Sequence, residues 1–472
     1  MILGGGDLAY GTSFDDDLSE RPEFILAKTL ELSDQISQKP EFLHYMGETF
    51  LERFESTQAE SDINNSVLAY ESAVQLLTTA DLEFPEYLHD YGISVYKQYI
   101  FTGAVEDIEK GISSLQRAVH LTPEYHADLP MLLSTLSGLL QTHFQVTGHF
   151  ANIEEAVLLQ QKCIQLTPEG HENMPRWLNS LGASLQSRFH HTGNLDDLSE
   201  AIKLQQKCIH LTPEGGAYLS TLLNNLAVAL NSRFVRTGGF DDISEAILLN
   251  RKSIQLIPDS HSSLPLYLNN LVTSLRLCFE HTGNIADLSE AILSQQKCIQ
   301  LTPEGHAGLS GWLVNLGSLF QLRFAHTKNL ADIAEAISLK QKGIQLVSGI
   351  HADLPIFLNS LGISLQSRFE HTKDLADISE AISLRRKCIQ LTPEGHANLP
   401  SLLNNIGIAL NIHFEFTGDL AENSEAISLQ KKGIQLTPEG SAYLPSWLNN
   451  LGISLQSRFE HTGDLADISE AI

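Results

Sequence analysis

Hydrophobic residues along the chain are spaced three or four positions apart in blocks, and the same block returns every 45 residues. In the block that runs from residue 355 to residue 399, Leu358, Leu365 and Phe369 lie on one face of a predicted helix. A second stripe, which begins at Ile378, predicts a second helix with its own buried face. Turn-forming residues separate the stripes, so the block is predicted to fold as two antiparallel helices joined by short turns.

A series of prolines shows the period of this pattern. The series comprises Pro40, Pro85, Pro130, Pro175, Pro265, Pro355, Pro400 and Pro445, with serine at the two positions between. From Pro40 to the end no insertion or deletion breaks the period, which gives nine full units and most of a tenth. A chain of 472 residues usually folds as about two to four domains. A repeat array is different, because it grows in one dimension and has no single core.

Each unit also carries signals for the ends of its helices. Pro355 suits the first turn of a helix, where its missing N–H is not needed. Thr372 ends the first helix, and the residue after this threonine is glycine in seven of ten copies, as at Gly463, which predicts a left-handed helix stop. Asp374 begins the second helix and Asp377 follows three residues later, which predicts an approximate capping box.

One glycine column lies inside the first helix. It contains Gly47, Gly92, Gly182, Gly317, Gly362, Gly407 and Gly452. Glycine inside a helix costs about 1 kcal/mol relative to alanine. Its recurrence therefore predicts that two helix backbones approach each other closely at this position.

The repeat resembles the tetratricopeptide repeat (TPR) family, whose signature is W-x2-L-G-x2-Y, then A-x3-F, then proline. The stretch "LNSLGISL" at residues 358–365 matches the first part with leucine in place of the aromatics. The stretch "EAISLRRKCIQLTP" at residues 380–393 is similar to the second helix of that family. Two features depart from the signature: Arg385 and its equivalents replace an aromatic residue, and each unit is longer than the family's 34 residues.

The resemblance implies an all-α fold, a right-handed α-solenoid or superhelix of TPR-like antiparallel helix pairs. We expect residues 1–39 to form a flexible N-terminus and a capping helix. Residues 40–472 are then the solenoid, with nine full repeats and a truncated tenth. A period of 45 also suits HEAT or armadillo repeats, which are about 40–47 residues long, but the leucine–glycine pattern followed by small residues favours TPR.

The charge and the cysteine content of the chain restrict the partners and the cellular compartment that we expect. The net charge of −27 argues against a basic surface for nucleic acid or for an anionic membrane. The five cysteines are odd in number and form no CxxC pair, so we expect free thiols in a reducing, cytoplasmic protein. The N-terminus has no signal-peptide pattern, and no stretch of 18 apolar residues exists.

Residues with catalytic or metal-binding chemistry follow the repeat lattice. Most histidines fall in a loop column, His126, His171, His261, His306, His351 and His396, or in a helix-end column, His191, His281, His326, His371 and His461. Equivalent residues in neighbouring repeats are about 10 Å apart, whereas zinc needs ligands about 2 Å from one centre. Cys163, Cys208, Cys298 and Cys388 share a column of small residues. We therefore expect no metal, no cofactor, no catalytic residue and no enzymatic activity.

Two neighbouring columns on the first helix are rich in asparagine. The first asparagine column contains Asn179, Asn224, Asn269, Asn359, Asn404 and Asn449, and the second asparagine column contains Asn225, Asn270, Asn315, Asn405 and Asn450. They resemble asparagines of kinesin light chain repeats and of O-linked N-acetylglucosamine transferase repeats, which implies binding of an extended peptide in a concave groove. A primary amide donates and accepts hydrogen bonds and so matches any peptide bond. The alternative is that these asparagines only link neighbouring helices.

The main functional hypothesis is a protein–protein interaction scaffold with a protein or peptide partner, and with no nucleic-acid or membrane partner. The sequence stops at Ile472, inside a second helix, so we expect a truncated chain whose uncapped end favours end-to-end self-association. Arrays with this repeat also resemble the TPR regions of large fungal proteins that often carry a C-terminal CHAT domain. That resemblance implies a second hypothesis, the regulatory or sensing arm of a caspase-like protease encoded downstream. A third hypothesis is a structural spacer.

Overall fold

The computed structural model describes residues 22–471, except residues 214, 217, 348–352, 397, 438–440 and 442. In this part of the chain all regular secondary structure is helical. The all-α fold of paired helices is therefore confirmed. The predicted flexible segment, residues 1–21, and the loop residue His351 lie outside the described residues.

Ten repeats follow a short N-terminal helix, α2 (Pro22–Leu30). The first helices of the repeats are α3 (Lys39–Thr57), α5 (Phe84–Thr102), α7 (Leu129–Thr147), α9 (Met174–Thr192), α11 (Leu219–Thr237), α13 (Leu264–Thr282), α15 (Leu309–Thr327), α17 (Leu354–Thr372), α19 (Leu399–Thr417) and α21 (Leu444–Thr462). The second helices are α4 (Glu60–Leu76), α6 (Val105–Leu121), α8 (Phe150–Leu166), α10 (Leu195–Leu211), α12 (Phe240–Gln255), α14 (Ile285–Gln300), α16 (Leu330–Gln345), α18 (Leu375–Leu391), α20 (Leu420–Gln435) and α22 (Leu465–Ala471).

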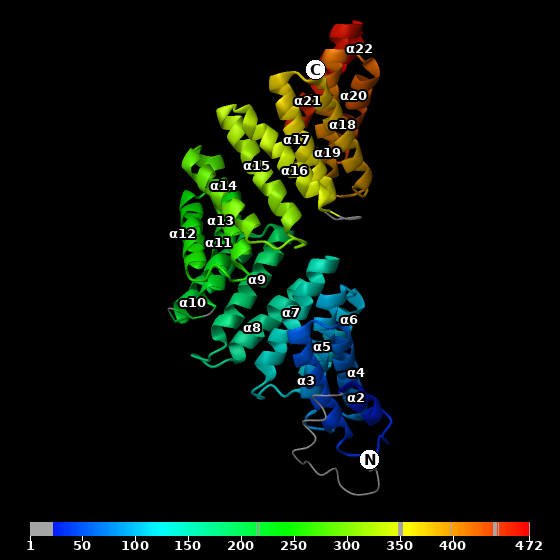
Figure 1. Cartoon of the computed structure of the whole chain (residues 1–472), viewed down its shortest axis with the longest axis vertical. Coiled ribbons are helices and arrows are strands. Elements are labelled where there is room, and N and C mark those ends of the chain that lie inside the picture. Colours follow the sequence, from blue (N-terminus) through cyan, green and yellow to red (C-terminus); the bar gives the residue numbers. More distant parts are fainter. Residues whose placement is uncertain are drawn as a thin grey trace. The chain divides into compact units, whose positions relative to one another are not determined.

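The chain divides into two compact units, Met1–Arg233 and Phe234–Ile472. Within each unit the first and second helix of a repeat pack against each other, and the second helix also packs against the first helix of the next repeat (Figure 1). In the second unit one continuous cluster of buried side chains runs from Phe234 to Ala426. In the first unit Leu26 of α2 packs against Phe50 and its neighbours. The predicted handedness of a superhelix concerns the whole chain and stays a prediction.

The predicted helix stops are confirmed. The residue after each first helix has a positive φ, between 71° and 76° where it is glycine, and Gln58, Lys328 and Lys373 adopt nearly the same conformation with φ of 56°, 59° and 60°. At the start of the second helix the Asp374 side chain accepts a hydrogen bond from the backbone N–H of Ala376 at 3.0 Å, as expected of a cap.

The capping role predicted for Asp377 is wrong. Its carboxylate accepts two hydrogen bonds from the guanidinium of Arg368, from Nε at 2.8 Å and from Nη2 at 2.5 Å. This planar, two-point contact joins the end of the first helix to the start of the second. The same pair recurs as Arg53–Asp62, Arg188–Asp197, Arg323–Asp332 and Arg458–Asp467. An arginine nine residues earlier therefore takes the carboxylate that the capping box would have used.

The close approach predicted at the glycine column is confirmed. A Cβ atom added to Gly317 would lie 2.8 Å from the backbone oxygen of Ala336 and 2.9 Å from Cγ of Lys340. At Gly407 the added atom would lie 2.5 Å from Cγ of Gln430. At Gly317 and Gly407 the first helix therefore has no room for a larger residue, because the second helix and one of its long side chains cross it directly.

The glycine contact predicts opposite effects of two alanine substitutions. Gly317→Ala should lower stability by about 1–3 kcal/mol, because the new methyl group overlaps a backbone oxygen that is fixed in a helix. Gly138→Ala, inside α7 with nothing within 4 Å of the added atom, should raise stability by about 0.5–1 kcal/mol. Urea unfolding followed by circular dichroism measures both. Equal effects of the two substitutions would contradict the packing described here.

Candidate functional site

The two asparagine columns form a ladder between successive first helices. The Nδ2 of Asn225 donates to Oδ1 of Asn179 at 3.1 Å, Asn315 donates to Asn269 at 3.3 Å, and Asn450 donates to Asn404 at 3.2 Å. Each bond joins the second column of one repeat to the first column of the repeat before it. At the same step in α3 and α5, Nε2 of His44 pairs with Oδ2 of Asp90 at 2.8 Å. We call these contacts the amide ladder.

The asparagines of the two columns differ in how far they are exposed to solvent. In the second column Asn315 is exposed, and Asn225, Asn270, Asn405 and Asn450 are half-buried. In the first column Asn224 and Asn404 are buried, Asn179, Asn269 and Asn359 are half-buried, and Asn449 is exposed. Asn224 and Asn270 also have partners of their own. The helix-linking role is therefore present at three steps, and the peptide-binding role stays a prediction.

Successive first helices lie closer together than successive second helices. Contacts join α7 to α9, α15 to α17 and α19 to α21, and at the last of these steps the short amide of Asn450 spans the distance to Asn404. Successive second helices are joined instead by long side chains, in the ion pairs Arg251–Glu290, Arg386–Glu425 and Lys431–Glu470. Within each unit the asparagine columns therefore lie on the face where the repeats are most closely spaced.

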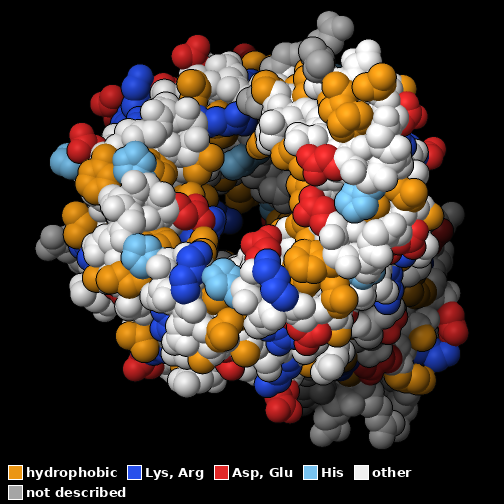
Figure 2. Space-filling view, turned by 90° about the horizontal axis from the view of Figure 1, so that it is seen from above, with side chains coloured by type: hydrophobic (Ala, Val, Ile, Leu, Met, Phe, Trp, Pro, Cys, Tyr) orange, Lys and Arg blue, Asp and Glu red, His pale blue; other side chains and the backbone are white. Residues whose placement is uncertain are grey.

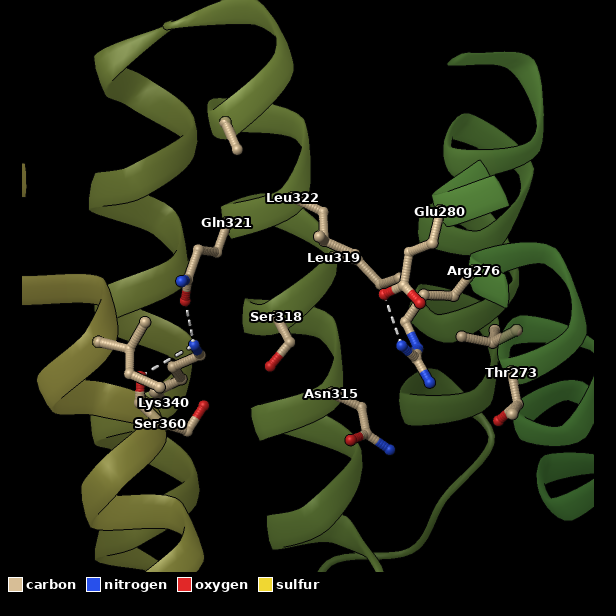
Figure 3. A pocket seen from close by; sticks show the side chains of 13 residues that line it. Thr273, Arg276, Glu280, Asn315, Ser318, Leu319, Gln321, Leu322, Lys340 and Ser360 are labelled. Carbon is tan, nitrogen blue, oxygen red and sulfur yellow. Dashed lines mark hydrogen bonds and ion pairs between the residues drawn. The ribbon is translucent and has the colours of Figure 1, made fainter. Parts of the chain in front are cut away.

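A pocket of about 440 Å³ opens on this face in the second unit. Side chains from α13, α15 and α17 line it, and Lys340 reaches it from α16. In Figure 3 Asn315 and Ser318 of α15 lie between Arg276 and Glu280 on one side and Lys340 on the other. Arg276 and Glu280 form an ion pair at 2.6 Å, so their charges offset each other.

Lys340 is a buried ammonium group without a carboxylate partner in the contacts described for it. Its side chain is 1% exposed. The Nζ donates to Oε1 of Gln321 at 2.6 Å, to Oγ of Ser364 at 2.8 Å and to the backbone oxygen of Ser360 at 3.1 Å. All three acceptors are neutral. Burial lowers the pKa of Lys340 to about 7, because water no longer stabilises the charged form.

Sequence reasoning missed Lys340, although the repeat lattice contains a signal for it. Its column holds amides in most other repeats, namely Gln160, Gln205, Asn250, Gln295 and Gln430, with Arg385 as the second basic residue. These amides are buried, and at least one polar atom of each lacks a hydrogen-bond partner in the described structure. A basic residue in this column reaches further and finds acceptors in two first helices.

The histidine and cysteine columns have structural roles. Helix-end histidines pack against the phenylalanine of the preceding repeat, as His371 does on Phe324 with ring centroids 4.8 Å apart. The Nδ1 of the loop residue His396 accepts from the backbone N–H of Asn398 at 3.2 Å. The Sγ of Cys163 donates to the Pro130 carbonyl, and burial raises the pKa of this thiol to about 12. Across the described residues, no group of three or more His, Cys, Asp and Glu side chains is placed to hold a metal ion.

On the face shown in Figure 2, acidic and basic side chains are interspersed with hydrophobic and neutral ones. Within the part of the chain that the structure describes, no helix combines the length and the apolar character that crossing a bilayer requires.

Comparison with known proteins adds only distant likenesses. No family model matches the chain, and no curated protein matches it. Among solved structures, the human IFIT1 dimer with m7Gppp-AAAA is 15% identical with a TM-score of 0.48, over 98% of this chain and 90% of that one. The apo form of the quorum sensor NprR from B. thuringiensis is 13% identical with a TM-score of 0.48, over 80% and 94%.

A third structure is the C-terminal part of a TPR repeat-containing protein from Cytophaga hutchinsonii. It is 15% identical with a TM-score of 0.40, over 66% of this chain and 99% of that one. Likenesses this distant carry no argument about function. The resemblance to TPR repeats therefore rests on the residues and helix pairs of this chain.

The lowered pKa of Lys340 predicts how stability depends on pH. Between pH 7 and the ordinary lysine pKa of 10.5, the unfolded chain keeps a proton that the folded chain has released. The stability of the wild type should therefore rise with pH over this range, relative to the variant Lys340→Gln. Urea unfolding of both proteins from pH 6.5 to pH 9.5 measures the difference.

Arg385→Gln serves as the matched control for this measurement. Burial lowers the pKa of Arg385 only to about 10. The difference in stability between Arg385→Gln and the wild type should therefore stay nearly constant below pH 9.5. Parallel pH profiles for the wild type and Lys340→Gln would show that Lys340 keeps an ordinary pKa.

Proposed function

We propose that this protein is a non-catalytic interaction scaffold that binds an extended peptide segment of a protein partner along its first helices. The observation that carries the proposal is the amide ladder, which places an asparagine pair at three steps on the face where the repeats are closest. Such an array fits a long, regular ligand better than a compact one, because equivalent groups recur at a fixed interval.

The hydrogen-bonding capacity of the ladder supports this function. A primary amide has two N–H groups and an oxygen with two lone pairs. The bond to Asn269 uses one N–H of Asn315, and the bond to Asn404 uses one N–H of Asn450. Each of these two side chains therefore keeps an oxygen and a second N–H for the main chain of a ligand.

The spacing of the repeats also suits an extended peptide. Packed helices are about 8–10 Å apart, and an extended chain advances about 3.3–3.6 Å per residue. One repeat therefore corresponds to about three peptide residues, so a peptide of nine residues spans about three repeats. Contacts of this kind recognise the peptide backbone and depend little on its side chains.

Other properties agree with a scaffold. The charge of −27 disfavours RNA or DNA as the partner, and the thiol pKa values are raised, which is the opposite of what a cysteine nucleophile needs. The alternative role as the arm of a CHAT-type protease stays a prediction from resemblance. The spacer hypothesis differs from ours in expecting no peptide binding at all.

Two double variants separate peptide contact from helix linking. Asn315→Ala with Asn450→Ala, and Asn269→Ala with Asn404→Ala, break the same two ladder bonds from opposite ends. Only the first variant removes the more accessible amides. We expect it to weaken capture of nonapeptides from a randomised, end-blocked library about tenfold, while the second variant weakens capture much less. Affinity chromatography with mass spectrometry measures the captured amount.

Circular dichroism and thermal melting of both double variants check that the fold persists. If the two variants lose capture equally, the asparagines act by linking helices. If the wild type captures no peptide, the scaffold proposal is wrong and the result supports the spacer hypothesis. A single-stranded RNA oligonucleotide serves as a third probe, and its binding in preference to peptides would also count against the proposal.

A further inference from the structure

The pocket in the second unit is where two amide columns of the repeat both change to basic residues. Lys340 replaces the glutamine or asparagine of its column in most other repeats. Arg276 lies in a second column of first-helix residues, which otherwise contains Gln141, Gln186, Asn231, Gln321, Gln366, Asn411 and Gln456 from the third repeat onward. Both basic residues line the same pocket. Because most other repeats fold with amides at these positions, folding alone does not require the change.

The buried charge of Lys340 carries a cost that its contacts offset only in part. An ammonium group taken out of water is unfavourable unless a negative charge or several hydrogen bonds replace the solvent. Lys340 has three neutral oxygens instead, from Gln321, Ser360 and Ser364. The glutamine found in other repeats carries no charge, although it leaves buried polar atoms without hydrogen-bond partners. A buried cation that lines a pocket favours an anionic ligand there.

The surroundings of Lys340 present donors to the pocket. The oxygen of the Gln321 side chain accepts from Lys340 and from the hydroxyl of Ser364, at 2.6 Å in each case. That orientation leaves the two N–H groups of the Gln321 amide as donors. In Figure 3 Gln321 and Lys340 lie together at one side of the pocket, and Asn315 of the amide ladder lies beside them on α15.

We propose that the Lys340 side of this pocket binds the carboxylate of an aspartate or glutamate side chain in the peptide segment. This inference rests on the proposed function. The amide ladder holds the main chain of the peptide, and one acidic side chain turns into the pocket. The N–H groups of Gln321 donate to the carboxylate, and the positive charge of the buried Lys340 stabilises the negative charge of the carboxylate.

The other charged groups around the pocket agree with this assignment. Arg276 and Glu280 of α13 form an ion pair with each other. The described residues of α15, α16 and α17 that line the pocket add no charged side chain apart from Lys340. Arg323 of α15 is paired with Asp332 of α16, and Arg368 of α17 is paired with Asp377 of α18. The lining of the pocket therefore carries one uncompensated positive charge, within a chain of net charge −27.

Two protonation states of Lys340 fit the observed hydrogen bonds. The ammonium form donates to Gln321, Ser360 and Ser364. The neutral amine donates to the first two and accepts from the Ser364 hydroxyl, whose single hydrogen then turns from Gln321 to the amine. Since burial lowers the pKa of Lys340 to about 7, a nearby carboxylate should raise that pKa and draw in a proton. At pH 8.5 binding should therefore take up close to one proton, and at pH 6 almost none.

The test compares glutamate with glutamine at a single peptide position. Three end-blocked nonapeptide libraries carry Glu, Gln or Lys at the central position and random residues elsewhere, and the full chain captures them from an equal mixture. We expect the glutamate library to be enriched. A captured glutamate peptide and its glutamine counterpart are then compared by isothermal titration calorimetry at pH 6.5, where the glutamate peptide should bind about tenfold more tightly.

Lys340→Gln and Arg385→Gln are the matched pair of variants. Both remove one buried positive charge from the same column and introduce the residue that other repeats hold there, but Arg385 does not line this pocket. The ratio of the affinities for the glutamate and glutamine peptides should fall to near one in Lys340→Gln and stay near ten in Arg385→Gln. The proton uptake, measured in two buffers of different ionisation enthalpy at pH 8.5, should disappear only in Lys340→Gln.

The outcomes distinguish this inference from the proposed function. Capture of peptides without a preference for glutamate, or a preference that survives in Lys340→Gln, would overturn the carboxylate pocket and leave the scaffold intact. Enrichment of the lysine library would overturn it as well. Failure to capture any peptide would overturn the proposed function, and this inference with it.

Discussion

The contact between each glycine of the first helix and the second helix that crosses it governs the rest of this structure. At Gly317 the backbone oxygen of Ala336 lies so close that a methyl group has no room. Because the two helices are this close, the side chain at position 340 lies across the first helix instead of pointing to solvent. It then reaches Gln321 on one first helix and Ser360 on the next. The packing that stabilises one repeat therefore also places a buried side chain beneath the face that carries the asparagines.

The amide ladder joins successive first helices to each other. Its hydrogen bonds fix the orientation of the second-column asparagines, since the N–H that donates to the preceding repeat determines where the oxygen of the same amide points. An amide held in this way loses less side-chain entropy when it meets a ligand. Linking helices and binding a peptide are therefore compatible roles for Asn225 and Asn315, because the first prepares the geometry that the second needs.

Much of the fold follows from the sequence because it depends on local and periodic signals. The helix pairs can be predicted from one unit, and the left-handed stops after Thr372 and its equivalents and the glycine contact can be predicted from the comparison of the units. The role of Asp377 was not, because its partner Arg368 lies nine residues away and competes with a cap only once the two helices are antiparallel. Helix linking by the asparagines was the predicted alternative, but the pairing in the ladder was not predicted, for a similar reason. The ladder pairs residues 46 positions apart, as in Asn315 and Asn269, so a reading that compares equivalent positions does not reveal the contact.

Lys340 was not predicted, for a different reason: the residues that the repeats share do not show where one repeat differs from the others. Positions that recur through the units, such as the buried leucines and the asparagines, provide packing and, in the proposed function, contacts to a peptide main chain that do not depend on the peptide's side chains. Selectivity needs a place where one repeat differs from its neighbours. A basic residue in an amide column is such a place, and its buried charge without a carboxylate partner makes the difference energetically large. In an array with this degree of internal identity, the proposed selectivity for a ligand therefore depends on the departures from the repeat, and the proposed contacts to its main chain depend on the repeated positions.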